Sequence, residues 1–333
     1  MNQAIAAALA DEMREDPSVM VMGEDIAVAG GPFKTSDGLL AEFGPLRVRD
    51  TPISEMGFTG AAVGASILGL RPVVEIMFVE FLGVALDALV TEAAKMRYLS
   101  NGEIGCPLVV RASVGSGLGF GCQHSQTLEN WLAATPGLKV VSPSDPQSAY
   151  GLMRAAIKDP DPVVVLEPRA LYAARDEVVT GSAGISTIGQ ARVVREGSAA
   201  TVVTLGQTTG VGLAVAEQAG LHIEVVDLLT LVPWDIPTVL ASVRRTGRLV
   251  VVEEAPASGG WGSEVVATVT SRAFGSLKAP PFRITAPDVP VPYAKHLEAR
   301  YLPSVEEVTV QLTEYLSTGS VPEPWWIREG IAR

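Results

Sequence analysis

Residues 51–64 hold a single acid, Glu55, at the head of a run of small side chains. Such a run can pack so closely that a flat ring could lie against it. A carboxylate in a nearly dry pocket must be protonated, paired or hydrogen-bonded to a ligand. The same glutamate could instead be an ordinary helix N-terminal acid that the backbone dipole stabilises. Glu55 is therefore the first candidate for chemistry, with both interpretations open.

A second polar cluster consists of Gln123, His124, Ser125 and Gln126, and it follows a glycine-rich loop at 113–122. Histidine has a reference pKa near 6.5 and suits proton transfer at neutral pH, although a lone histidine is also a common structural residue. The loop invites comparison with dinucleotide-binding glycines. However, no helix begins directly after it, and no acid follows at the required distance. The cluster is therefore the second candidate for chemistry, with a structural role for His124 still open.

The elements that must position these residues alternate between short aliphatic strands and helices. We expect strands at 19–22, 71–78, 107–111, 138–142, 163–166, 201–205, 222–227 and 249–253. We expect helices at 2–15, 55–69, 80–99, 145–158, 208–219, 235–245, 263–273 and 304–316. This alternation predicts parallel sheets with helices on both faces, in which ligands bind beyond the carboxyl ends of the strands.

The rhythm stops at 172–198, which predicts a crossing between domains, and it restarts afterwards. The fold class is therefore α/β with two doubly wound domains, at 1–185 and 199–316, followed by a tail at 317–333. A proline-rich stretch at 280–292 is expected to be extended. The tail carries Trp325 and Trp326, and because free ends seldom expose two tryptophans we expect it to dock onto a neighbouring subunit.

Composition excludes several classes of function. The chain has 333 residues, 47% of them apolar, and a net charge of −12, which argues against nucleic acid or an anionic membrane as a partner. Cys106 and Cys122 are too few for a disulfide framework and lack metal-site spacing, so a reduced compartment is expected. No apolar run reaches the ~20 residues of a membrane span, and no basic leader is seen. We expect a cytoplasmic bacterial protein.

Eight segments, in order, resemble the β subunit of the E1 component of 2-oxoacid dehydrogenase complexes, which are transketolase-like thiamine-diphosphate enzymes. They are 22–25, 51–57, 92–95, 123–126, 136–143, 161–167, 226–233 and 287–292. The resemblance implies a pyrimidine-binding domain followed by a transketolase C-terminal domain. The family's Gly-Asp-Gly motif for the metal-bound diphosphate is missing. A separate α subunit would therefore hold Mg²⁺ and the diphosphate in an α2β2 heterotetramer.

The resemblance assigns a role to each candidate residue of the cofactor site. Glu55 would hydrogen-bond N1′ of the aminopyrimidine and favour its imino tautomer, so that the 4′-nitrogen can take the C2 proton. Phe81 would pack on the ring, or be an ordinary core residue. Glu24 would lie in a polar channel between two cofactor sites, or be a solvated acid at a strand end. Val84 stands where some relatives have a second acid, which puts the channel in doubt, although Glu80 lies one helical turn away.

The remaining candidates concern substrate and ions. His124 would position the substrate carboxylate or handle protons during acyl transfer to lipoamide, and Gln123 is a neighbouring cofactor-binding candidate. Asp159 and Asp161 match a segment in which some relatives bind K⁺, although Asp-Pro pairs are also common in turns.

The function implied by the resemblance is that of an oxidoreductase with a disulfide acceptor. With its α subunit, the chain would decarboxylate a 2-oxoacid, first of all pyruvate, and reductively acylate lipoamide on an E2 acyltransferase. Acetoin and branched-chain 2-oxoacids are the alternative substrates. Acids of the second domain, among them Glu253 and Glu254, could pair with basic groups of E2. A non-catalytic assembly subunit and a self-sufficient transketolase-type enzyme are the rival functions.

Overall fold

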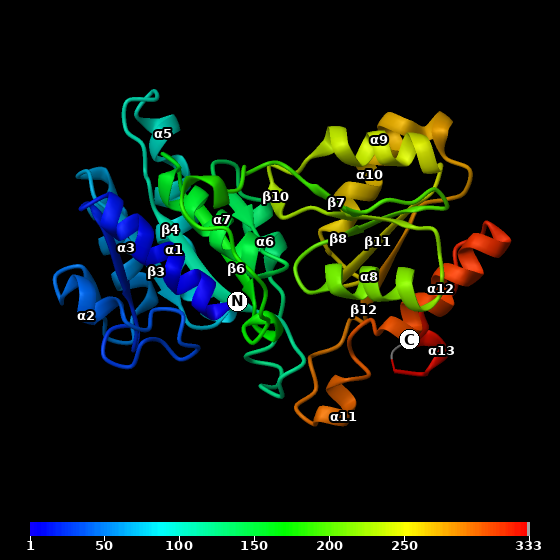
Figure 1. Ribbon diagram of the computed structural model, residues 1–333, viewed down its shortest axis with the longest axis horizontal. Helices are drawn as coiled ribbons and strands as arrows, with labels where there is room; N and C mark the ends of the chain where they lie inside the picture. Colours follow the sequence, from blue (N-terminus) through cyan, green and yellow to red (C-terminus); the bar gives the residue numbers. More distant parts are fainter. Residues whose placement is uncertain (332–333) are drawn as a thin grey trace. The chain divides into compact units, whose positions relative to one another are not determined.

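The computed structural model describes residues 1–331, which fall into two compact units (Figure 1). Unit 1 comprises Met1–Val114, Trp131–Ile188 and Leu231–Pro233. Unit 2 comprises Gly115–Asn130, Gly189–Thr230 and the chain from Trp234 onward. Most of the glycine-rich loop, together with His124 after it, thus belongs to the unit formed mostly by the C-terminal half of the chain.

Unit 1 is built on a seven-stranded sheet of order β10-β5-β6-β4-β3-β1-β2. The strands are β1 (Val19–Gly23), β2 (Val48–Asp50), β3 (Arg71–Ile76), β4 (Val109–Val114), β5 (Lys139–Val141), β6 (Val163–Pro168) and β10 (Thr230–Val232). The pairs from β5 through β2 are parallel. Strands β3, β4 and β6 are almost wholly buried, because helices cover both faces of a parallel sheet.

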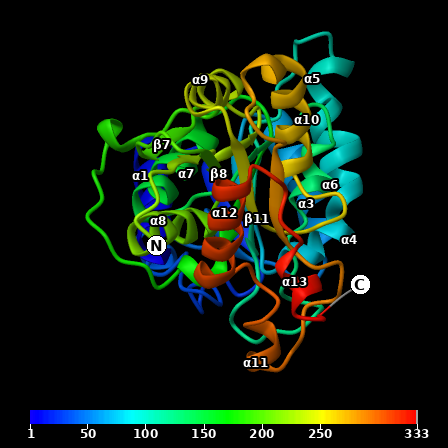
Figure 2. The ribbon, with the colours of Figure 1, turned by 90° about the vertical axis from the view of Figure 1, so that its right-hand side faces the viewer.

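Helices α1 (Asn2–Glu15) and α7 (Pro146–Lys158) pack together on one side of this sheet, and α3 (Glu55–Ile67) and α4 (Leu82–Leu86) on the other (Figure 2). The start of α7 is encoded locally. The side chain of Asp145 accepts a hydrogen bond from the backbone N–H of Ser148 at 2.6 Å, and Pro146 occupies the first helical position. Shorter helices are α2 (Leu39–Phe43), α5 (Met96–Leu99) and α6 (Glu129–Ala133).

The single helix predicted at 80–99 is interrupted. A 3-10 turn at Val79–Phe81 precedes α4, and a π-helical segment at Asp87–Glu92 and a second 3-10 turn at Ala93–Lys95 separate α4 from α5. Hydrophobic periodicity predicts helical structure but does not reveal a change of hydrogen-bond register within it.

Unit 2 contains a five-stranded sheet of order β12-β11-β8-β9-β7, parallel except for β7 at its edge. The strands are β7 (Arg192–Arg195), β8 (Thr201–Thr204), β9 (Glu224–Asp227), β11 (Leu249–Pro256) and β12 (Phe282–Ala286). The sequence prediction missed β7, inside the expected crossing, and β12, inside the proline-rich stretch.

The helices of unit 2 are α8 (Thr208–Gln218), α9 (Ile236–Thr246), α10 (Gly262–Ala273), α11 (Lys295–Glu298), α12 (Val305–Thr318) and α13 (Trp325–Arg328). Helices α8 and α12 pack together on one face of the sheet, and α9 and α10 pack together on the other (Figure 1). The two doubly wound α/β arrangements match the fold class expected from the sequence.

The expectation that the tryptophan tail docks onto a neighbouring subunit is wrong for Trp325. This side chain is 2% exposed and belongs to the core of unit 2, together with Tyr315 of α12 and Ile284 of β12. Its indole Nε1–H donates to the carbonyl of Thr285 at 3.1 Å. Trp326 is half-buried against the same core. The tail therefore buries its apolar surface on its own unit.

Candidate active site

Three candidate residues follow three neighbouring strands of unit 1. Phe81 comes after β3, Glu24 comes directly after β1, and Glu55 opens α3 after β2, while the sheet order places β1 between β3 and β2. The backbone N–H of Thr51 donates to the carbonyl of Gly23 at 2.9 Å, which ties the connection before Glu55 to the end of β1. These side chains therefore gather at the carboxyl edge of the sheet, where open parallel sheets bind ligands.

Glu24 and Glu55 share an environment that disfavours two negative charges. Burial raises the pKa of Glu24, and the negative charges of Glu55 and Asp25 raise it further. Glu55 is 8% exposed, and its carboxylate accepts no hydrogen bond from any residue that the structure describes. The pKa of Glu24 is therefore shifted in the direction that favours its protonated form.

Other polar atoms at this edge also lack partners among residues 1–331. Glu24 Oε1 and the hydroxyl oxygens of Thr51 and Thr59 are buried and make no hydrogen bond there. Thr59 lies one turn beyond Glu55 on α3. Buried polar atoms are nearly always satisfied in folded proteins, so such a cluster indicates a group that the chain does not itself supply.

Phe81 is half-buried and belongs to an aromatic group. Its ring meets Phe78 edge-on at 5.8 Å, and Phe78 meets Phe33 in the same way at 5.9 Å. The guanidinium of Arg169 lies 4.7 Å from the ring centre of Phe78. Phe81 is thus held firmly and is still accessible enough to contact a ligand.

Sequence reasoning missed a buried ion network beneath this edge. Arg111 on β4 is 1% exposed, pairs with Glu75 on β3, and binds both oxygens of Glu167 on β6 at 2.6 and 2.7 Å. The hydroxyl of Tyr172 donates to Glu167 at 2.7 Å. A signal was present in the sequence, because Glu75, Arg111 and Glu167 each interrupt a largely aliphatic strand. The network fixes the strands from which Phe81 and the glycine-rich loop emerge.

His124 and Gln123 belong to unit 2, so the structure does not bring them into one unit with Glu24, Glu55 and Phe81. Gln123 is exposed and His124 is half-buried. The backbone N–H of His124 donates to the carbonyl of Gly121 at 3.2 Å, which forms a tight turn at the end of the glycine-rich loop.

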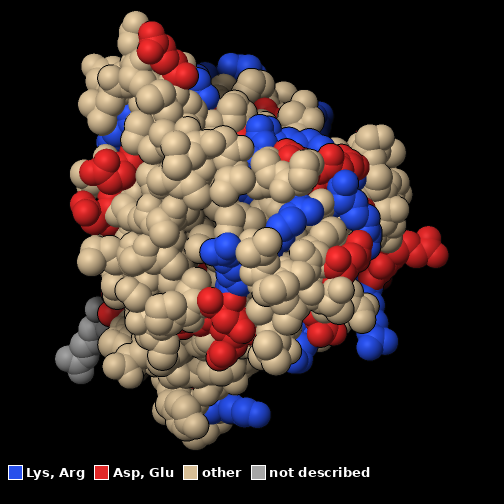
Figure 3. Space-filling view, turned by 90° about the vertical axis from the view of Figure 1, so that its left-hand side faces the viewer, with Lys and Arg blue, Asp and Glu red and all other residues tan. Residues whose placement is uncertain are grey.

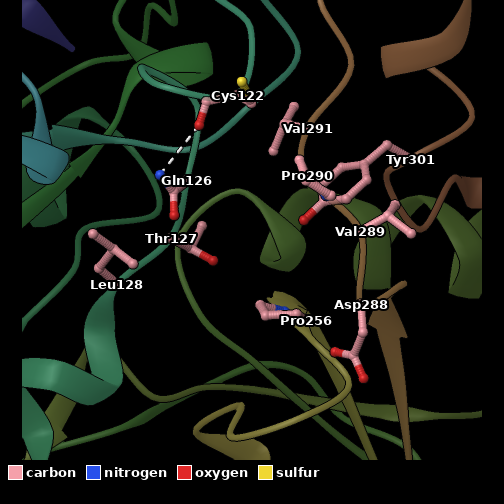
Figure 4. Close-up of a pocket in the computed structure, with 10 residues that line it drawn as sticks. All are labelled: Cys122, Gln126, Thr127, Leu128, Pro256, Asp288, Val289, Pro290, Val291 and Tyr301. Carbon is pink, nitrogen blue, oxygen red and sulfur yellow. Dashed lines mark hydrogen bonds between the residues drawn. The ribbon is translucent and has the colours of Figure 1, made fainter.

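The end of the glycine-rich loop and the residues after it border a cavity of about 470 Å³ within unit 2 (Figure 4). Gln126, Thr127 and Leu128 line one side, and the segment from Asp288 to Val291 and Tyr301 line the other. The side chain of Gln126 donates to the carbonyl of Cys122 at 3.1 Å.

Glu129, at the end of the same loop, is 7% exposed. Burial raises the pKa of Glu129 to about 8, and the nearby charges of Glu254 and Glu253 contribute. This carboxyl therefore keeps its proton at neutral pH.

The expectation that Glu253 and Glu254 pair with a partner protein is wrong. Glu253 is fully buried and binds Arg283 at 2.8 Å. Glu254 is 9% exposed and accepts the backbone N–H of Ser116 at 2.6 Å. Both carboxylates are thus used inside unit 2.

Asp159 and Asp161 lie between α7 and β6, at the amino edge of the sheet of unit 1, away from the edge that gathers Glu24 and Glu55. Both carboxylates are paired: Asp159 binds Lys139 at 2.7 Å, and Asp161 binds Arg97. Arg71 also donates to the carbonyl of Asp159 at 3.2 Å. The expected potassium site stays a prediction. Lys139, Arg97 and Arg71 already bind the carboxylate and carbonyl oxygens that would coordinate the ion.

The surface of unit 1 carries exposed apolar side chains around α3, α4 and α5. They are Ile53, Met56, Leu68, Val84, Tyr98 and Leu99. Figure 3 shows one face of the molecule on which acidic and basic side chains are interspersed and a broad area bears neither. No helix within the described chain is long and apolar enough to cross a membrane.

Comparison with known proteins identifies the family of this chain. Residues 1–175 match the transketolase pyrimidine binding domain, and residues 189–308 match the transketolase C-terminal domain. The mitochondrial pyruvate dehydrogenase E1 component subunit beta-1 of Arabidopsis thaliana is 44% identical over 314 residues, covering 92% of this chain and 86% of that protein. The chain belongs to the E1 β-subunit family of 2-oxoacid dehydrogenases.

Other relatives agree with this assignment, and one more distant structure shares the fold. The pyruvate dehydrogenase E1 subunit beta of Rhizobium meliloti is 44% identical over 92% of this chain and 68% of its own length. The acetoin:2,6-dichlorophenolindophenol oxidoreductase subunit beta of Cupriavidus necator is 40% identical over 95% of this chain and 97% of its own. A solved structure described as a split gene transketolase, inactive beta4 tetramer, shares the fold with a TM-score of 0.76, at 24% identity over 95% of this chain and 97% of that one.

Proposed function

We propose that this E1 β chain joins an α subunit in an α2β2 heterotetramer that decarboxylates pyruvate and reductively acetylates lipoamide on an E2 acyltransferase. The observation that carries the proposal is the carboxyl edge of unit 1. There Glu55 and Glu24 lie together with buried oxygen atoms that no described residue satisfies. The names of the 44% identical relatives support pyruvate as the substrate.

Thiamine diphosphate, when bound, supplies the acidic carbon and the electron sink that loss of carbon dioxide requires. The residues at this edge fit its pyrimidine half. Glu55 is the group that would exchange a proton with N1′, because its carboxylate has no competing partner in the described chain. Burial and the charge of Glu55 raise the pKa of Glu24, and Phe81 offers an aromatic surface to the ring. Since the chain has no Gly-Asp-Gly motif, we assign Mg²⁺ and the diphosphate to the α subunit.

His124 is the residue that we propose for the substrate end of the site, where it holds the substrate carboxylate or moves protons during acyl transfer. Gln123 beside it is exposed and free to contact a ligand. The exposed apolar side chains around α3, α4 and α5 are the ones that we propose a partner subunit covers.

The test is to assemble the chain with its α subunit and measure kcat/KM for pyruvate, acetoin and branched-chain 2-oxoacids, with 2,6-dichlorophenolindophenol or a lipoyl domain as acceptor. We expect the largest kcat/KM for pyruvate and no turnover from either subunit alone. Acetoin is the second candidate, because the acetoin relative is 40% identical over 95% of this chain and 97% of its own. Faster turnover of acetoin would replace pyruvate, and turnover by the β chain alone would overturn the shared site.

A further inference from the structure

The glycine-rich loop before His124 is closed at its neck and held from the inside. The backbone N–H of Gly115 donates to the carbonyl of Gln126 at 3.1 Å, which closes a ring of chain that contains Gln123 and His124. Within this ring, Gly115, Gly117, Gly119 and Gly121 all have positive φ angles, between 73° and 99°. Backbone turns of this kind direct successive N–H groups to one side and form an anion-binding concavity.

The anions that fill this concavity come from the second half of the chain. Glu298, at the end of α11, accepts the N–H of Gly117 on Oε1 at 2.8 Å and the N–H of Gly119 on Oε2 at 2.7 Å. Glu254, on β11, accepts both the N–H and the hydroxyl of Ser116, at 2.6 and 2.8 Å. Its other oxygen accepts the side-chain amide of Gln207. Each carboxylate therefore makes charge-assisted hydrogen bonds through both of its oxygens.

The burial of these groups makes their hydrogen bonds matter. Glu298 is 2% exposed and Ser116 is 1% exposed, so water could not easily replace a lost partner of the Glu298 carboxylate or of Ser116. The segment next to α11 also confines the loop sterically, because a Cβ atom on Gly121 would lie 3.2 Å from the ring of Tyr293. The loop donors are thus bound to the chain's own carboxylates and are not left for a phosphate.

We infer that Glu298 and Glu254 are positioning residues for the loop that presents His124, and that unit 2 sets the place of this histidine through them. The inference rests on the proposed role of His124 at the substrate end of the site. Loss of the Glu298 charge would leave the backbone N–H groups of Gly117 and Gly119 with one acceptor between them, and the loop would sample several conformations. A displacement near 1 Å can lower turnover by about a hundredfold, even when the displaced group is chemically intact.

The experiment compares Glu298→Gln with His124→Ala and with the double variant, each assembled with the α subunit and assayed with pyruvate. Glu314→Gln is the matched control, because this acid lies in an exposed ion pair with Arg328 on the same unit. We expect Glu298→Gln to lower kcat roughly ten- to a hundredfold, with thiamine-diphosphate affinity unchanged. We expect the double variant to be no slower than His124→Ala, because Glu298 acts through the histidine. Hydrogen exchange at Gly117 and Gly119 should accelerate in Glu298→Gln and not in the control.

The outcomes separate the two claims. If His124→Ala retains full turnover, the proposed role of His124 fails, and exchange at Gly117 and Gly119 still decides whether Glu298 orders the loop. If His124→Ala is slow and Glu298→Gln is not, the positioning role is wrong and the proposed function stands. If the losses of turnover from the two single substitutions multiply in the double variant, Glu298 acts independently of His124, through general stability. That outcome also overturns the inference.

Discussion

Glu55 in unit 1 and Glu298 in unit 2 are both acids from which water is nearly excluded, at 8% and 2% exposure. Glu55 lies two residues before Gly57 in α3, and Glu298 binds Gly117 and Gly119 in the loop before His124. Glu298 accepts a backbone N–H on each oxygen, whereas Glu55 accepts none from the described chain. A buried carboxylate whose bonds are complete holds the chain in place. Glu55, which has no hydrogen-bond partner in the described chain, is the one that we propose for a group from outside.

The largest expected effect concerns the unsatisfied acid. Glu55→Gln should lower turnover of the assembled enzyme by about 10²–10⁴-fold, the range of general acid–base catalysis. Stability should change little, because the carboxylate makes no hydrogen bond within the described chain. Pyruvate turnover and urea unfolding measure the two effects. Glu42→Gln, at an exposed acid paired with Arg14, is the control. Unimpaired turnover in Glu55→Gln would favour a non-catalytic assembly subunit.

The buried carboxyl of Glu129 should make the stability of the protein depend on pH. Burial and the charges of Glu254 and Glu253 raise the pKa of Glu129 to about 8, from an ordinary value of 4.5. Between these pH values the unfolded chain releases the proton and the folded chain keeps it, so this group's contribution to stability falls as pH rises from 4.5 to 8. Glu129→Gln should remove that slope and raise stability at pH 8 by a few kcal/mol. Urea unfolding at several pH values is the measurement, and an unchanged slope would contradict the burial of a protonated acid.

The glycines of the loop should resist substitution. Gly117 has a φ angle of +99°, and its N–H binds Glu298. Gly117→Ala should therefore destabilise the protein by about 1–2 kcal/mol, because a Cβ atom is strained in this region. It should also accelerate hydrogen exchange around Ser116. Thermal unfolding and exchange measure both, and a neutral result would mean that the loop is not tightly held.

The smallest effect has the opposite sign and lies on α3. Gly60 is exposed in the helix interior, and a Cβ atom there would meet nothing within 4 Å. Gly60→Ala should stabilise the isolated chain by about 0.5–1 kcal/mol through helix propensity. The same substitution thus distinguishes the two glycine segments. If Gly60→Ala instead lowers the stability of the protein, the exposed face of α3 is already covered in the isolated chain.

Much of the fold was predictable because its signals are local. The five predicted strands of unit 1, β1 and β3 to β6, lie in short, mostly aliphatic runs, whereas the short strands β2 and β10 were not predicted. Helices such as α1 and α7 have clear periodicity or caps. The missed strands lacked such a signal: β7 is a half-exposed antiparallel edge strand, and β12 stands among prolines. Their pairing depends on neighbours distant in sequence, which local patterns do not record.

The candidate site was predictable in part for the same reason. Glu55, Glu24 and Phe81 could be named from motifs, and adjacent parallel strands then place them at one edge. The Arg111 network was missed because its three charges lie in separate strands. Glu254 looked like a partner-binding acid, because no local pattern shows that a carboxylate bonds to an amide in a loop 138 positions away.

The sequence by itself determined which residues are fit for chemistry, the parallel α/β architecture and the family, because residue type and periodicity act locally and are written in order. Only the tertiary structure decided which carboxylates are satisfied and which are left open. That difference depends on hydrogen bonds between residues far apart in the chain, and such bonds form only when packing brings donor and acceptor within about 3 Å of each other.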